Sequence, residues 1–215
     1  MIILPVKNLA NAKQRLAAVL EQPARTELAQ TMLTDVVEAL AAYAGDGVSL
    51  VTSDPFAIEL AGEHGFEIIP DESNVSETDA VEMASRVCEA RGVESTLVIP
   101  GDIPLIEARD IQAIYDASSD TGTVLAPSKD KRGTNAVLRR PASLFPLRFG
   151  NDSFMPHLVA AIATRATCVV LSLPRVALDI DTPEDLQQLV NAGSAKRSQR
   201  LARKFGFPEA VAADV

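Results

Sequence analysis

Short apolar runs alternate along the chain with longer runs in which apolar residues recur every three or four positions. The short runs predict strands at residues 1–6, 48–53, 67–70, 95–100, 122–126, 136–139 and 168–173. The longer runs predict helices at residues 22–42, 56–64, 78–91, 108–117 and 154–163. This alternation predicts a three-layer α/β fold, in which helices cover a mostly parallel, Rossmann-like sheet.

The end of the chain defines the predicted domain. Thr182 suits the N-cap of a further helix, because Pro183 then takes the first helical position and acidic residues fill the first turn. We expect residues 1–192 to form a single domain, since 215 residues suffice for one sizeable core and are few for two. The basic segment 193–215 is expected to be a solvated helix and tail, with packing in a homodimer as the alternative.

The composition narrows the choice of partners. A formal net charge of −9 argues against a chain that coats nucleic acid or an anionic membrane, although local cations or a metal ion still allow an anionic substrate. Cys88 and Cys168 lie far apart without metal-ligand spacing, so we expect reduced thiols and a cytoplasmic protein. The first apolar run is too short for a signal peptide, and no apolar stretch approaches transmembrane length.

Three aspartates are the candidate metal ligands. Asp102 follows the 95–100 run, at the edge of a parallel sheet where ligands bind. Asp179 and Asp181 are two positions apart, so a strand-like backbone turns both to one face, where they repel unless a cation or a proton lies between them. Mg²⁺ prefers such oxygen ligands together with substrate phosphates. The alternatives are Asp102 and Asp181 as caps and Asp179 as a surface charge.

Cations follow the first predicted strand. We expect Lys7 to bind substrate, and Lys13 and Arg15 to cradle a triphosphate, because Lys supplies a point charge and Arg a bidentate fork. The loop is not a Walker A motif, since the glycine-rich stretch and its Gly-Lys-Ser/Thr sequence are missing. A solvated basic loop is the alternative.

Two polar loops are candidates for an anion site. Gly133-Thr134-Asn135 forms one, and the segment 149–154, with Gly150 and Ser153, forms the other. Small hydroxyl residues beside glycine present N–H and O–H donors to a phosphate or a carboxylate, although ordinary turns have the same composition. His157 follows closely, and we expect it to be structural, with a general base as the alternative.

Together these segments resemble a known family, the small guanylyltransferases that make the phospho-carboxylate precursor of coenzyme F(420). The resemblance extends from Ile3 to about Leu189 and rests on the order and spacing of its motifs. The motifs are Leu4-Pro5-Val6-Lys7, Ala12-Lys13-Gln14-Arg15-Leu16, Pro100-Gly101-Asp102-Ile103-Pro104, Gly133-Thr134-Asn135, Phe149-Gly150-Asn151-Asp152-Ser153-Phe154 and Leu178-Asp179-Ile180-Asp181-Thr182-Pro183-Glu184-Asp185-Leu186.

The resemblance implies a nucleotide-diphosphosugar-transferase-like fold and the transfer of GMP from GTP to a small phosphorylated acid, with release of pyrophosphate. The acceptor would be 2-phospho-L-lactate, phosphoenolpyruvate or 3-phospho-D-glycerate. The matching motifs imply that Mg²⁺ is bound by Asp102, Asp179 and Asp181, that the acceptor is held by Thr134, Gly150 and Ser153, and that Lys13, Arg15 and Asp102 form the catalytic set.

One segment departs from the family pattern. Where the family carries Gly-Leu-Asn near the nucleotide base, this chain has Ser76-Glu77-Thr78. Thr78 is thus expected to bind substrate in place of the Asn, but a hydroxyl cannot replace the paired donor and acceptor of an amide, which leaves adenine open beside guanine. The rival hypotheses are a nucleotidyltransferase of the same fold acting on a sugar phosphate or a molybdenum cofactor, and a non-catalytic nucleotide-binding protein.

Overall fold

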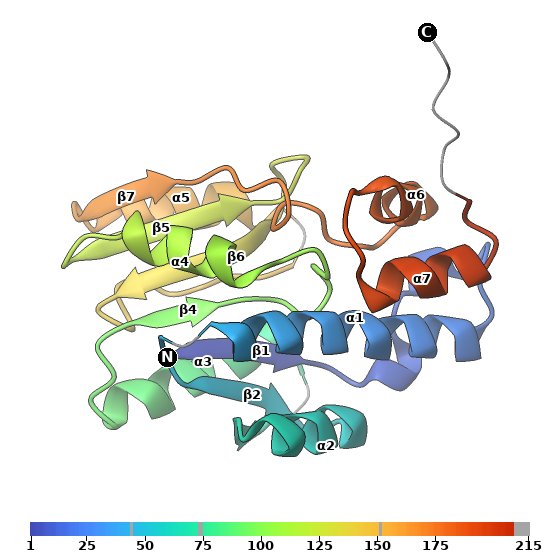
Figure 1. The fold of residues 1–215 in the computed structure, drawn as a ribbon. Helices are drawn as coiled ribbons and strands as arrows, with labels where there is room; N and C mark the ends of the chain where they lie inside the picture. The colour runs from blue at the N-terminus through green and yellow to red at the C-terminus, as the bar shows by residue number, and fades with distance from the viewer. Residues whose placement is uncertain (44, 73–74, 151, 209–215) are drawn as a thin grey trace, which may run out of the picture.

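The computed structural model describes residues 1–43, 45–72, 75–150 and 152–208. Its core is a seven-stranded sheet of order β3-β2-β1-β4-β6-β5-β7 (Figure 1). Every neighbouring pair is parallel except those of β6, which runs antiparallel to both β4 and β5. The mostly parallel sheet is therefore confirmed. The strands are β1 (Ile2–Val6), β2 (Val48–Thr52), β3 (Glu67–Pro70), β4 (Thr96–Val98), β5 (Gly122–Pro127), β6 (Thr134–Arg140) and β7 (Thr167–Val170).

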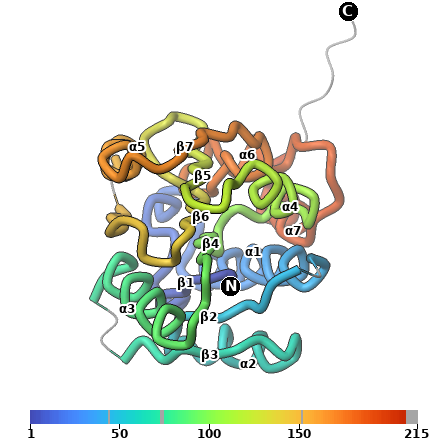
Figure 2. The backbone as a smooth tube through the Cα atoms, turned by 90° about the vertical axis from the view of Figure 1, so that its left-hand side faces the viewer, coloured from blue at the N-terminus to red at the C-terminus, as the bar shows by residue number. Residues whose placement is uncertain are grey.

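Helices cover both faces of the sheet, which confirms the three layers (Figure 2). Leu33 and Val36 of α1 pack in the core on one face, and Val81 and Ala84 of α3 in the core on the other. No helix within the described part of the chain combines the length and hydropathy that a bilayer crossing requires. The first face carries α1 (Gln22–Ala42), α2 (Pro55–His64) and α4 (Ala108–Asp116), and the second carries α3 (Glu77–Ala90) and α5 (Phe154–Ala163).

The predicted elements have the right type and differ mainly at their ends. α5 occupies the predicted residues, and Gly65 closes α2 with a φ of 66°, the left-handed conformation of many helix ends. β6 begins at Thr134, two residues before the predicted strand, because Thr134 pairs with Pro127 across the hairpin with β5. Two 3-10 turns after β1, η1 (Leu9–Asn11) and η2 (Gln14–Leu16), are too short for an apolar pattern to reveal.

The chain ends with two helices, α6 (Pro183–Asn191) and α7 (Arg197–Lys204). Thr182 caps α6 as predicted, since its hydroxyl accepts from the backbone N–H of Asp185 while the Asp185 carboxylate accepts from the N–H of Thr182. α7 packs against α1 and α6 (Figure 1). Residues 209–215 of the predicted tail lie outside the described residues.

Asp35 of α1 anchors α7. Its buried carboxylate accepts hydrogen bonds from the backbone N–H groups of Arg197 and Ser198 at 3.0 and 2.9 Å, and from the Ser198 hydroxyl at 2.6 Å. The first N–H groups of a helix have no partner within the helix, and a negative charge near them is favourable. A side chain of one helix thus caps another that lies far along the sequence.

Replacing Asp35 with Ala should lower the free energy of unfolding by about 2 to 3 kcal/mol, because hydrogen bonds to a buried carboxylate are lost and their donors are left unpaired. Urea denaturation measures this change, and hydrogen exchange over residues 197–204 should accelerate. Glu38→Ala is the control, since Glu38 loses only an exposed ion pair with Arg197 and should cost less than about 0.5 kcal/mol. Equal losses in the two variants would contradict the anchoring role of Asp35.

Candidate functional site

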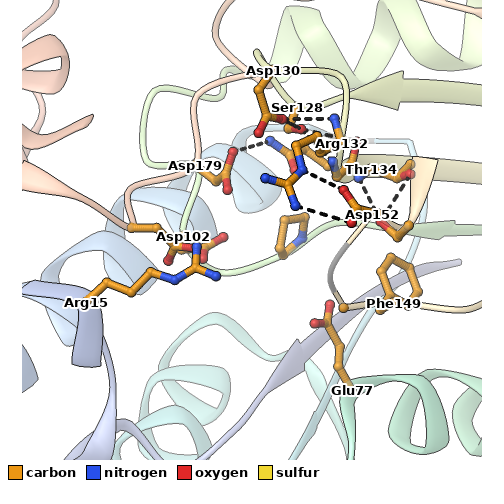
Figure 3. A pocket seen from close by; sticks show the side chains of 16 residues that line it. Arg15, Glu77, Asp102, Ser128, Asp130, Arg132, Thr134, Phe149, Asp152 and Asp179 are labelled. Atoms are coloured by element: carbon orange, nitrogen blue, oxygen red, sulfur yellow. Dashed lines mark hydrogen bonds and ion pairs between the residues drawn. The ribbon is translucent and has the colours of Figure 1, made fainter. Parts of the chain in front are cut away.

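Two pockets open at one edge of the sheet, where β1 and β4 end and the antiparallel β6 begins. The β6 pocket, of about 290 Å³, is formed mainly by Ser128, Asp130 and residues 132–135, 149–150 and 152–153 (Figure 3). The β1 pocket, of about 490 Å³, is formed mainly by residues 5–9 and 11–15 and by α1. The two pockets meet at a shared wall, which consists of Arg15, Glu77, Pro100, Asp102 and Asp181.

Lys13 holds the shared wall together. Its Nζ donates hydrogen bonds to Asp102 Oδ2 at 2.7 Å and to Asp181 Oδ1 at 3.0 Å. Burial alone lowers the pKa of an ammonium, but the charges of Asp102 and Asp181 raise the pKa of Lys13 above its usual value. Arg15 donates to the other oxygen of Asp181 at 3.2 Å. The structure therefore brings together the residues predicted as catalytic, although they lie far apart in sequence.

Asp179 and Asp181 both line the β6 pocket, as their spacing predicts. Ile180 between them is fully buried, and its backbone N–H donates to the carbonyl oxygen of Asp102 at 3.1 Å. The alternation of a strand is thus present, although the segment forms no regular strand. The bond from Ile180 fixes this segment beside the turn that carries Asp102.

Asp179 is held apart from the other two carboxylates. Its Oδ1 accepts a hydrogen bond at 3.0 Å from Nδ2 of Asn135, which also donates to the Val176 carbonyl oxygen at 2.9 Å. Burial, reinforced by the charge of Asp102 and opposed by the Asn135 bond, raises the pKa of Asp179. Within the described ranges, no group of three or more His, Cys, Asp or Glu side chains stands ready to hold a metal ion. The ammonium of Lys13 lies between two of the predicted ligands, and Asn135 holds the third.

Glu77, the first residue of α3, is an acid in the shared wall that the sequence reasoning did not single out. Within the described part of the chain, its carboxylate has no hydrogen-bond or ion-pair partner. Burial and the charge of Asp102 raise the pKa of Glu77 to about 7, against the opposing charges of Lys7 and Lys13. The available signal was the departure from the family pattern, which introduced a charge where the family carries Leu.

Lys7 and Thr78 make structural contacts beside the pockets. Lys7 lines the β1 pocket, and its Nζ donates to the buried Asp71 at 2.8 Å. Thr78 is not among the residues that line the two pockets. Its Oγ1 accepts from the backbone N–H of Phe149 at 2.8 Å and lies 3.3 Å from the Phe149 carbonyl oxygen. The hydroxyl of Thr78 thus tethers the loop before α5, and its expected contact with substrate stays a prediction.

The predicted acceptor residues converge on the β6 pocket. Ser153 Oγ accepts from the backbone N–H of Thr134 at 3.0 Å, and His157 Nδ1 lies 3.0 Å from Thr134 Oγ1. Gly150 has a φ of 111°, a conformation that residues with a side chain rarely adopt, and its backbone borders open space. Burial and the charge of Arg139 lower the pKa of His157 to about 4. His157 lies behind Thr134 and does not line the pocket, which favours the structural role.

The β6 pocket also contains a cation that the sequence reasoning missed. Arg132 Nε donates to Asp152 Oδ1 at 2.5 Å, and a terminal nitrogen of Arg132 donates to Asp152 Oδ2 at 3.2 Å (Figure 3). Both side chains line the pocket and are largely exposed. The polar loop before β6 was the only local signal for Arg132. Asn151, part of the motif that contains Asp152, lies outside the described residues.

Solved structures share this fold. A Desulfovibrio desulfuricans protein assigned provisionally to the nucleotide-diphospho-sugar transferases superposes with a TM-score of 0.77 at 18% identity, covering 94% of this chain and 93% of that one. A cytidylyltransferase from Leptospira borgpetersenii superposes with a TM-score of 0.59 at 13% identity, covering 95% of this chain and 90% of its own. These identities are low, so the likeness concerns the fold, and it confirms the predicted nucleotide-diphosphosugar-transferase-like architecture.

Curated relatives are more similar in sequence. The phosphoenolpyruvate guanylyltransferase of Chloroflexus aggregans is 36% identical over 87% of this chain and 95% of its own length. The 2-phospho-L-lactate guanylyltransferase of Methanothermobacter thermautotrophicus is 32% identical over 95% of this chain and 90% of its own. The family described as "Guanylyl transferase CofC like" matches residues 1–213. The chain therefore belongs to the CofC-like guanylyl transferase family.

Proposed function

We propose that this protein transfers GMP from GTP to a small phosphorylated carboxylic acid and releases pyrophosphate. The observation that carries the proposal is the shared wall, where two pockets meet at Asp102, Asp181 and Arg15. A transferase needs its two substrates to meet at one point, in a geometry close to that of reaction. The names of the relatives support GTP as the donor and a phospho-acid as the acceptor. A role in coenzyme F(420) biosynthesis is part of the proposal and rests on the sequence resemblance alone.

The β1 pocket suits the nucleotide. Leu9 and Ala12, which are only partly buried, form part of its lining and offer an apolar surface for a base, with the buried Met32 and Leu33 of α1 beneath. The cations of the loop after β1 lie at the side that joins the β6 pocket, where the phosphates of a bound nucleotide would lie. Lys13 and Arg15 are paired with carboxylates in this structure, and both would neutralise the triphosphate.

The β6 pocket suits a small anionic acceptor. Its volume of about 290 Å³ suits a small ligand. Thr134 and Ser153 supply hydroxyl groups, and Gly150 supplies backbone that approaches the space closely. Arg132 adds a guanidinium that would exchange Asp152 for a carboxylate or a phosphate in the same bidentate manner. These groups support the phospho-acid over a neutral acceptor.

Mg²⁺ is the proposed cofactor, and the donor set fits a cation. One oxygen of Asp102 and one of Asp181 already lie within 3.0 Å of a single positive centre, the Lys13 ammonium. Carboxylate oxygens are the ligands that Mg²⁺ prefers. Asp102 and Asp181 would hold the ion, with Asp179 joining them once its bond to Asn135 is exchanged. When bound, the ion would neutralise phosphate charge at the shared wall.

The chain's own residues would then act mainly through charge and position. The attacking oxygen of a phospho-acid is already anionic, so the reaction requires no general base. Its barrier lies in bringing two polyanions together, which the cations at the shared wall would lower. Lys13 and Arg15 would hold the triphosphate against Asp102 and Asp181, while Thr134 and Ser153 hold the acceptor in line. A neutral, buried His157 fits this scheme, since no proton needs to be removed.

A pyrophosphate-release screen tests the proposal directly. GTP and ATP are each offered with phosphoenolpyruvate, 2-phospho-L-lactate, 3-phospho-D-glycerate and a sugar phosphate, with Mg²⁺ and with a chelator. Release that requires GTP and one phospho-acid is the expected result. Release only with a sugar phosphate would favour the rival acceptor class, and nucleotide binding without release would favour a binding protein.

We also propose a cytoplasmic localisation, which the free thiols of Cys88 and Cys168 suit. A homodimer is likewise proposed, and light scattering tests it.

Asp102→Asn and Asp181→Asn should each reduce GMP transfer by about 100-fold or more at saturating substrates, because each removes a charge that organises the cations at the reacting phosphate. Pyrophosphate release measures the rate. Asp116→Asn is the matched control, since Asp116 is an exposed carboxylate on α4 and should keep its activity within about twofold. Near-wild-type transfer by either shared-wall variant would contradict the proposed site.

Glu77→Gln should stabilise the free protein at pH 8. The pKa of Glu77 is about 7 in the folded chain and 4.5 as its ordinary value, so the folded state binds the proton more tightly. Stability contributed by that proton is complete below pH 4.5 and is lost as the pH rises through 7. The variant should exceed wild type at pH 8 by on the order of 1 kcal/mol, after allowance for screening in the cleft.

Urea denaturation at pH 5 and pH 8 measures this difference, which should nearly vanish at the lower pH. Glu63→Gln removes one exposed carboxylate from α2 and controls for a general change in net charge. A stabilisation of Glu77→Gln that is equal at both pH values, or matched by Glu63→Gln, would show that burial of the Glu77 charge is not its cause.

A further inference from the structure

His157 is the buried titratable side chain that the proposed function leaves without a task. It lies on α5 with 1% of its surface exposed, and its ring meets the ring of Phe149 edge to face at 5.1 Å. Both ring nitrogens are engaged. Nε2 lies 2.9 Å from the backbone nitrogen of Arg148, and Nδ1 lies 3.0 Å from Thr134 Oγ1. The imidazole therefore connects the loop before α5 with the first residue of β6.

The position of the ring proton follows from these two contacts. A backbone N–H can only donate, so Nε2 must accept the hydrogen bond from Arg148 with its lone pair. A neutral imidazole carries one proton, which must then sit on Nδ1. Burial and the charge of Arg139 lower the pKa of His157 to about 4, which keeps the ring neutral at physiological pH. Nδ1–H consequently donates to Thr134 Oγ1.

This bond decides what the Thr134 hydroxyl can do. A hydroxyl has one proton to donate and two lone pairs that accept. Since His157 supplies a donor to Thr134 Oγ1, the proton of that hydroxyl must point elsewhere. Ser153 Oγ, which accepts from the backbone N–H of Thr134, lies 3.5 Å from Thr134 Oγ1 and is placed to donate to it weakly, so it too faces Thr134 Oγ1 as a donor. Thr134 lines the β6 pocket, so its proton is available to a ligand there.

We propose that His157 is a positioning residue, which fixes the Thr134 hydroxyl as a hydrogen-bond donor to an anionic oxygen of the ligand in the β6 pocket. The identification of that ligand as the phospho-acid acceptor rests on the proposed function. An oxygen of a phosphate or a carboxylate can only accept, so it matches a fixed donor. A ligand that presents an N–H or O–H group to Thr134 places one donor against another, so no hydrogen bond forms and that ligand binds less well. His157 thus contributes to acceptor selection without touching the acceptor.

Two substitutions distinguish the roles of the two ring nitrogens. His157→Asn places an amide near the position of Nδ1, where it can still donate to Thr134 Oγ1, and it gives up the contact with Arg148. His157→Gln reaches the position of Nε2, where it can still accept from Arg148, and it gives up the donation to Thr134. We expect His157→Gln to raise the KM for phosphoenolpyruvate about tenfold, with the KM for GTP unchanged. His157→Asn should keep the KM for phosphoenolpyruvate within about threefold of wild type.

A double-mutant cycle shows whether the effect passes through Thr134. Thr134→Val keeps the shape of the side chain and removes the hydroxyl, so it should raise the KM for phosphoenolpyruvate about tenfold. Adding His157→Gln to Thr134→Val should then cause little further loss, because the hydroxyl that His157 orients is absent. Independent, multiplicative losses would overturn the proposal, since a merely structural His157 acts without regard to the hydroxyl. The same holds if His157→Asn and His157→Gln raise the KM equally.

The tautomer can be observed without any substrate. The chain has two histidines, so multiple-bond nitrogen–proton spectra of histidine-labelled protein contain two ring systems, and His64→Gln assigns them. We expect His157 to carry its proton on Nδ1 at pH 7, the reverse of the form that dominates in free histidine. A proton on Nε2, or a doubly protonated ring, would overturn the proposal even in an active enzyme. If no phospho-acid supports pyrophosphate release, the proposed function fails separately, while an Nδ1 proton still upholds the hydroxyl orientation.

Discussion

The ammonium group of Lys13 joins three parts of the chain that are distant in sequence. It draws the turn after β4 and the segment before α6 to the loop after β1, through the carboxylates of Asp102 and Asp181. The Lys13 side chain is only 8% exposed, and a buried charge is costly without a partner, whereas an ion pair at this distance attracts strongly where water is scarce. The edge of the sheet that holds both pockets is therefore shaped before any ligand arrives, and each ligand that enters must exchange charge with this centre.

That exchange explains why the site combines cations and carboxylates in near balance. A triphosphate would take Lys13 and Arg15 away from Asp102 and Asp181, which then need another cation. A divalent ion restores the balance, so nucleotide and metal would favour each other's binding through shared partners rather than through direct contact alone. Arg132 and Asp152 repeat the arrangement on a smaller scale in the β6 pocket. In both places an internal ion pair orders a cation that a bound anion would take over from the carboxylate.

The sequence could predict much of this site because apolar periodicity locates the strands, and parallel strands end at one edge. Asp102 and Lys13 were found in this way. Two hydrogen bonds could not be predicted from the sequence: the one from Asn135 to Asp179 and the one from the backbone of Arg148 to His157. Each depends on the orientation of a side chain toward another segment, which no local pattern encodes. Thr78 and Glu77 show the limit of motif matching. The hydroxyl of Thr78 is bonded to the backbone of Phe149, and Glu77, which the motif did not predict, lines both pockets. The direction of β6 had a signal in its short link to β5, which suits a hairpin and is too short for a helical crossover.

The reversed direction of β6 has a consequence for how such an enzyme changes over generations. The pocket proposed for the acceptor takes most of its lining from the hairpin that leads into β6 and the loop that leads into α5. The pocket proposed for the nucleotide takes its lining from segments before residue 103 and from Asp181, and the two pockets have only the shared wall in common. The residues proposed to recognise the donor and the acceptor therefore come from largely separate segments of the chain. Substitutions in the hairpin before β6 would thus alter the proposed acceptor pocket and leave most of the proposed nucleotide pocket unchanged.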